Sequence, residues 1–160
     1  MGGVNGAEAL KALYALQEKD LEIDRLRAEA ESLPEELVAL QGQVETLEER
    51  LTNLLERRAE LEREYNRHSL DIEDLSAKEK QAEEEQKRAQ SAREQTQYEN
   101  RIQQIKDRIR ELLELSTPIM EAMENLEAEI AQVEEELAAL RPRLQELLEA
   151  NRARVAELEA

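Results

Sequence analysis

The sequence predicts an all-α protein: a long antiparallel coiled-coil hairpin with an additional N-terminal helix. Two runs of apolar residues are spaced alternately three and four positions apart, a repeat that keeps one stripe of a helix facing a partner helix. The runs are nearly equal in length, and no large aliphatic residue stands between Leu75 and Tyr98. Charged residues make up 38% of the chain and its three aromatic residues are all Tyr, a composition typical of long helices rather than of a compact core.

The N-terminal part is expected to contain a flexible start at 1–6 and a separate helix at 7–33. Ser32, Pro34 and Glu35 combine a cap residue, a helix-starting proline and a carboxylate, so they predict a break or a strong kink at Pro34. A kinked, nearly continuous helix competes with a full break, because Leu33 to Leu37 keeps the heptad step. The apolar residues on or near one face of this helix are Leu10, Leu13, Leu16, Ile23, Leu26, Ala30 and Leu33.

The hairpin is expected over 34–160, with its turn near 90–97. Thr96 and Glu99 have the spacing of a capping box at the start of the second arm. The alternative is a continuous rod that dimerises in parallel; we favour the hairpin because the two runs match as antiparallel arms. The first arm's seam is Leu37, Leu40, Val44, Leu47, Leu51, Leu54, Arg58, Leu61, Tyr65, His68, Ile72, Leu75, Glu79, Ala82, Gln86 and Ala89.

The second arm carries two prolines, Pro118 and Pro142, at which local bends are expected. Its seam is Tyr98, Ile102, Ile105, Ile109, Leu112, Ser116, Ile119, Met123, Leu126, Ile130, Val133, Leu137, Leu140, Leu144, Leu147 and Asn151. Pairing the arms about residue 94 leaves almost nothing for 7–33 to pair with. That helix is expected to fold back, to form a homodimer, or to pack on a further segment, and the mid-helix end at Ala160 predicts that the natural chain continues.

Net charge excludes some partners. At −17 the chain repels phosphate backbones, which disfavours nucleic acid and anionic membranes as direct partners. Without Cys, no disulfide or cysteine-ligated metal is expected, and no cofactor, metal ligand or catalytic residue is predicted. No apolar run reaches membrane-spanning length and no signal-peptide pattern opens the chain, so we expect a protein of the cytoplasm. The sequence offers no Gly-rich phosphate loop, Ser/His/Asp arrangement or nucleophilic Cys, so we expect a non-enzymatic protein.

Four polar residues interrupt the seam of the first arm: Arg58, His68, Glu79 and Gln86. Arg58 is expected opposite Ile130, with Glu127, Glu129 and Glu134 in the neighbourhood, where it would fix the register of the arms at some cost in stability. His68, the one histidine, is expected in a half-buried layer facing Ile119 and Met123, since a lone His makes no zinc site.

Near the turn, the second arm is more apolar than the first. Tyr98, Ile102, Ile105 and Ile109 are expected to face thin or polar residues of the first arm and so to remain incompletely covered. Uncovered apolar stripes often mark docking surfaces, which makes these four residues a predicted protein-binding site. Close approach of the helices at small Ala residues is the competing interpretation.

Several motifs resemble the bacterial coiled-coil/zinc-ribbon proteins. These are Leu16-Gln17-x-x-Asp20-x-x-Ile23, Leu33-Pro34-Glu35-Glu36-Leu37, the tip followed by Tyr98, and Leu115 to Leu126 including Met123-Glu124. The resemblance implies a helical hairpin followed by a ribbon with four zinc-binding cysteines. This chain has no cysteine, so zinc is expected only if a further C-terminal ribbon exists.

The expected function is that of an adaptor or scaffold for protein partners. The resemblance implies that such a ribbon contacts nucleic acid or the transcription machinery while the rod contacts protein. The alternatives are a transcription-elongation factor whose tip enters the RNA polymerase channel, which needs paired acidic residues to hold a metal ion, and a purely structural parallel dimer.

Overall fold

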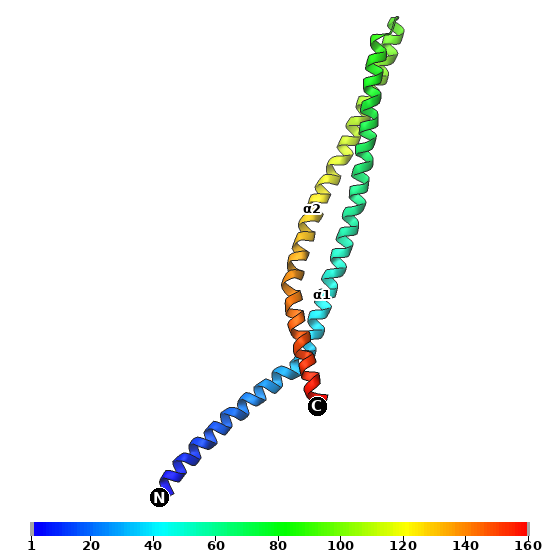
Figure 1. Cartoon of the computed structure of the whole chain (residues 1–160). Coiled ribbons are helices and arrows are strands. Elements are labelled where there is room, and N and C mark those ends of the chain that lie inside the picture. Colours follow the sequence, from blue (N-terminus) through cyan, green and yellow to red (C-terminus); the bar gives the residue numbers. More distant parts are fainter. Residues whose placement is uncertain (1, 160) are drawn as a thin grey trace. The chain divides into compact units, whose positions relative to one another are not determined.

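Two long helices joined by a short turn make up the computed structural model, which describes residues 2–159 and the side chains of 6–159 (Figure 1). Helix α1 spans Gly2–Lys87 and α2 spans Ala92–Glu159. No strand occurs between residues 2 and 159, and the two helices pack against each other as antiparallel arms. The predicted all-α hairpin is therefore confirmed, and the continuous rod is wrong.

The chain divides into two compact units. One consists of 49–134 and contains the turn, whereas the other combines 1–48 with 135–160. Within the first unit, α1 and α2 are tied by the ion pairs Arg58–Glu127 and Glu79–Lys106. Within the second, Glu48 pairs with Arg141, and Glu36 lies near Arg143. Both units thus have the antiparallel register of a hairpin.

The seam follows the predicted heptads. Every seam position of both runs is buried or half-buried, which confirms the stripe that each arm turns toward the other. The 3–4 spacing achieves this because the repeat keeps side chains on one side of each helix. Leu112, Val133 and Leu137 are the most deeply buried large side chains.

The turn lies at 88–91, close to the start of the predicted stretch. Ser91 caps α2, because its Oγ accepts the amide hydrogen of Glu94 at 3.1 Å, while the Glu94 carboxylate accepts that of Gln90 at 3.2 Å. The predicted cap at Thr96 is wrong: Thr96 lies inside α2, where its hydroxyl donates to the Ala92 carbonyl at 2.9 Å. Ser91 and Glu94 show the same three-residue spacing in the sequence, and that signal was available.

The N-terminal part also differs from the prediction. Helix α1 continues through Pro34, so the predicted break between a helix at 7–33 and the hairpin is wrong and the nearly continuous helix is correct. The heptad step from Leu33 to Leu37 is kept across Pro34, and the helix continues despite the amide donor that proline lacks. Helix α1 begins at Gly2 rather than at the predicted Ala7, and Met1 lies outside the described residues. Helix α2 likewise continues through Pro118 and Pro142.

Candidate interaction surfaces

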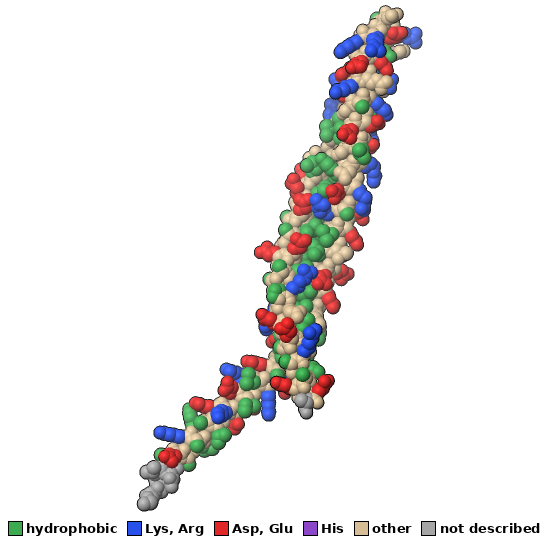
Figure 2. All heavy atoms as spheres, viewed as in Figure 1, with side chains coloured by type: hydrophobic (Ala, Val, Ile, Leu, Met, Phe, Trp, Pro, Cys, Tyr) green, Lys and Arg blue, Asp and Glu red, His purple; other side chains and the backbone are tan. Residues whose placement is uncertain are grey.

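The N-terminal part of α1 carries an unpaired apolar surface. Every side chain from residue 6 to residue 29 is exposed, which confirms that this part has no counterpart among the described residues. Figure 2 shows apolar side chains at the surface of this segment. Seven large apolar side chains are each at least 46% exposed here: Leu10, Leu13, Tyr14, Leu16, Leu21, Ile23 and Leu26.

These side chains form two faces. Leu16, Ile23 and Leu26 continue the 3–4 spacing of the hairpin seam, and we call them the seam face. Leu10, Tyr14 and Leu21 are separated by four and seven positions, so they share another face of the same helix. A helix with apolar residues on two faces is suited to contact with other helices rather than to isolation in water.

The stripe near the turn is covered. Ile102 and Ile105 are only 8% exposed, and Tyr98 and Ile109 are half-buried. Ala82 across from them is 2% exposed, so a small side chain lets the helices approach closely and seal the stripe. The expectation that these residues remain uncovered is wrong for Ile102 and Ile105, and the competing interpretation explains their packing. Tyr98 and Ile109 are covered in part, and partner binding by the four residues stays a prediction.

Tyr98 is nonetheless perturbed by this packing. Burial raises the pKa of its phenol, and the negative charge and hydrogen bond of Glu85 raise it further. Both effects favour the neutral phenol, so Tyr98 acts as a packed seam residue at the turn end of the hairpin.

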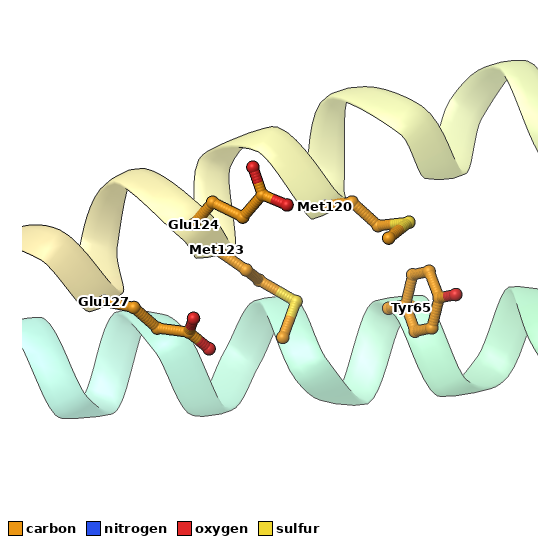
Figure 3. A pocket seen from close by; sticks show the side chains of 5 residues that line it. All are labelled: Tyr65, Met120, Met123, Glu124 and Glu127. Carbon is orange, nitrogen blue, oxygen red and sulfur yellow. The ribbon is translucent and has the colours of Figure 1, made fainter.

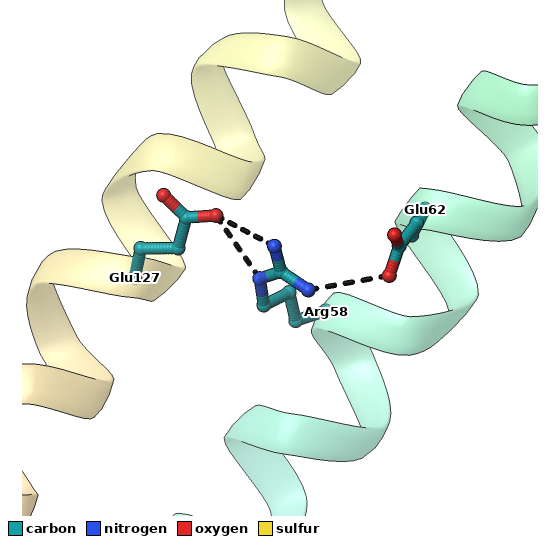
Figure 4. A network of polar contacts seen from close by, with 3 residues as sticks. All are labelled: Arg58, Glu62 and Glu127. Atoms are coloured by element: carbon teal, nitrogen blue, oxygen red, sulfur yellow. Dashed lines mark hydrogen bonds and ion pairs between the residues drawn. The ribbon is translucent and has the colours of Figure 1, made fainter.

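Arg58 joins the two helices at the predicted place (Figure 4). Its Nε and Nη2 donate to Oε1 of Glu127 at 3.1 and 2.8 Å, and its Nη1 donates to Oε2 of Glu62 at 3.2 Å. The hydrogen bond to Glu127 is the main cause that raises the pKa of the guanidinium above its usual range. A fixed pair between the helices selects one register, because a heptad slip would separate the charges.

His68 lies half-buried in the seam, as expected. Its Nε2 is 4.0 Å from Oε1 of Glu64, whereas its Nδ1 is buried without a hydrogen-bond partner. A buried ring nitrogen without a partner costs stability, and we assign His68 a place in the packing and no chemistry.

Sequence patterns alone did not reveal an open groove beside the Arg58 pair (Figure 3). Tyr65 of α1 and Met120, Met123, Glu124 and Glu127 of α2 line it, and its volume is about 260 Å³. In Figure 3 the side chains of Tyr65 and Met120 point toward each other across it. Only the pairing of the arms brings Tyr65 beside the two methionines. The one signal in the sequence is Met120, a large apolar residue directly after the seam position Ile119.

Within residues 2–159, no group of three or more His, Cys, Asp or Glu side chains is placed to hold a metal ion. No helix in the same range is both long and apolar enough to cross a membrane. No model of a known family, no curated protein and no solved structure matches this chain. The fold and surfaces define a class, a helical hairpin in which the N-terminal part of α1 is unpaired.

Proposed function

We propose that this chain is a non-enzymatic adaptor that binds a partner protein through helix–helix contacts on the seam face of α1. The observation that carries the proposal is the exposure of Leu16, Ile23 and Leu26 at heptad spacing, continuous with a seam that is buried from Leu37 onward. Burying one such side chain contributes roughly 1.5–3 kcal/mol, so a helix covering several of them gains useful affinity.

The occupant we propose is a helix of another protein. A pattern of apolar residues three and four positions apart fits a helix with the same repeat, as in a coiled coil. Lys19 interrupts the seam face between Leu16 and Ile23. In a parallel, in-register homodimer two Lys19 side chains would meet, whereas a different partner can place a carboxylate there.

The resemblance to coiled-coil/zinc-ribbon proteins is compatible with such an adaptor, and a link to nucleic acid or transcription would then reside in a ribbon outside this chain. No observation favours a factor that enters the polymerase channel. The acidic side chain in the first turn of α2, Glu94, already accepts the Gln90 amide as part of the cap.

The test uses a photo-crosslinking side chain at position 16 or 23 in cells that express the protein, followed by affinity measurement with the purified partner. We expect one discrete crosslinked protein, and we expect the double variant Leu16→Glu and Ile23→Glu to lower its affinity at least about tenfold. The matched control replaces two other exposed leucines of α1 by Glu, Leu55→Glu and Leu70→Glu, and should bind normally.

Crosslinking only to a second copy of the chain would contradict the adaptor and favour a structural dimer. Equal loss of affinity in the test and control variants would show that the seam face is not the binding surface.

A further inference from the structure

We propose that the groove lined by Tyr65, Met120 and Met123 is a second docking site, which binds a basic amphipathic helix of a partner protein. It lies within the unit of 49–134 and is separate from the seam face of α1. The inference therefore goes beyond the proposed function and fails or holds independently of it.

The groove is open and mostly apolar. Met120, which lines the groove, is 47% exposed, so an apolar side chain of the groove is open to solvent. A volume of about 260 Å³ accommodates one or two side chains, whereas small-molecule sites usually measure about 300–1,000 Å³. Methionine side chains are flexible and polarisable, so they adapt to apolar side chains of an incoming helix.

The charge of α2 identifies the kind of helix. From Glu111 to Glu134 the chain contains seven glutamates and neither Lys nor Arg. Met120, Glu124, Glu127 and Glu134 follow one another at intervals of four, three and seven positions, which places them on one face of α2. The groove is thus bordered along the helix by carboxylates.

Most of this charge is not compensated inside the protein. Glu127 is paired with Arg58, but no ion pair of the described residues involves Glu124 or Glu134. Lysines or arginines beside the apolar residues of a partner helix would complement these carboxylates. The same carboxylates repel nucleic acid and anionic lipid, which leaves a basic protein helix as the occupant.

The test measures binding of a synthetic amphipathic helix of about 18 residues, with Leu on one face and Lys on the other, to the full chain. We expect saturable binding that weakens as salt is added, because charges at the rim of a contact are screened. A peptide with the same leucines and Glu in place of Lys should not bind. Equal binding of the two peptides would overturn the proposal.

Two charge variants test the position of the site. Glu124→Gln with Glu134→Gln removes two carboxylates from the groove face and should weaken the Lys peptide about fivefold. Glu114→Gln with Glu129→Gln removes two unpaired carboxylates from other faces of α2 and should change affinity less than about twofold. Equal losses in the two variants would show attraction to an acidic rod in general and would overturn the proposal.

Two further variants test the apolar part. Met120→Ser should weaken the Lys peptide at both low and high salt, whereas Leu115→Ser, at a similarly exposed leucine of α2, should not. The seam-face variant with Leu16→Glu and Ile23→Glu should bind this peptide normally. If that variant loses binding while Met120→Ser keeps it, the peptide occupies the seam face and the groove is not a site. Disulfide trapping between copies of a Met120→Cys variant without peptide would identify a second copy as the occupant and likewise overturn the proposal.

Discussion

Arg58 of α1 directs two nitrogens at a single oxygen of Glu127 of α2, with Nε and Nη2 at 3.1 and 2.8 Å from Oε1. The pair replaces an apolar layer in a seam that is otherwise mostly Leu, Ile and Val. Polar pairs in such a seam contribute specificity of register more than stability.

Replacing Arg58 by Leu should therefore raise the melting temperature, by roughly 2–4 °C, because an apolar residue completes the seam. Glu127→Gln keeps Arg58 but removes its charged partner, so it should lower the melting temperature. Thermal unfolding followed by circular dichroism measures both. A lower melting temperature for Arg58→Leu would mean that the pair stabilises the hairpin outright.

The stability of two variants near the turn tests whether Ser91 or Thr96 caps the start of α2. Ser91→Ala removes the acceptor for the Glu94 amide and should lower the free energy of unfolding by about 1 kcal/mol. Thr96→Ala, inside α2, should be neutral or slightly stabilising because Ala has the higher helix propensity. Urea denaturation measures both variants. A larger loss of stability for Thr96→Ala than for Ser91→Ala would indicate that Thr96, and not Ser91, caps α2.

Neighbouring leucines of α2 test the seam. Leu112 is 2% exposed and Leu113 is 53% exposed, so the two positions differ mainly in burial. Leu112→Ala should lower the free energy of unfolding by about 2–5 kcal/mol, and Leu113→Ala by no more than about 0.5 kcal/mol. Similar losses at both positions in urea denaturation would place Leu113 in a contact outside the seam.

Tyr98 predicts a loss of stability in alkaline solution. Its folded pKa is raised above the ordinary value of about 10, so the folded state binds the phenolic proton more tightly than the unfolded state does. This contribution is fully present below pH 10 and is lost as pH rises through the folded pKa. A variant with Tyr14→Phe and Tyr65→Phe keeps Tyr98 as its one tyrosine. Ultraviolet titration of this variant should show ionisation of the phenol at a higher pH in water than in urea. Coincident transitions would contradict it.

The sequence by itself determined the helices, the seam and the antiparallel pairing. Heptad spacing acts locally along each helix, so positions as different as Leu37, Arg58 and Asn151 were assigned to the seam without knowledge of their contacts. The same logic predicts that 7–33 has almost no counterpart, and the exposure of residues 7–29 agrees with it. Partner-binding sites are harder to predict from the sequence. The exposed fraction of a side chain depends on the residues of the other helix that lie opposite it, and the periodicity of one helix does not reveal these.

Only the tertiary structure decided the details that depend on contacts across the helices. Ala82, Ile102 and Ile105 are all buried, although the sequence alone left the two isoleucines uncovered. Helix α1 continues through Pro34, although local signals favoured a break. The groove between Tyr65 and Met120 exists because two segments distant in sequence meet there. Heptad periodicity fixes which residues of each helix face the other helix, but it does not fix how completely their side chains fill the space between the two helices.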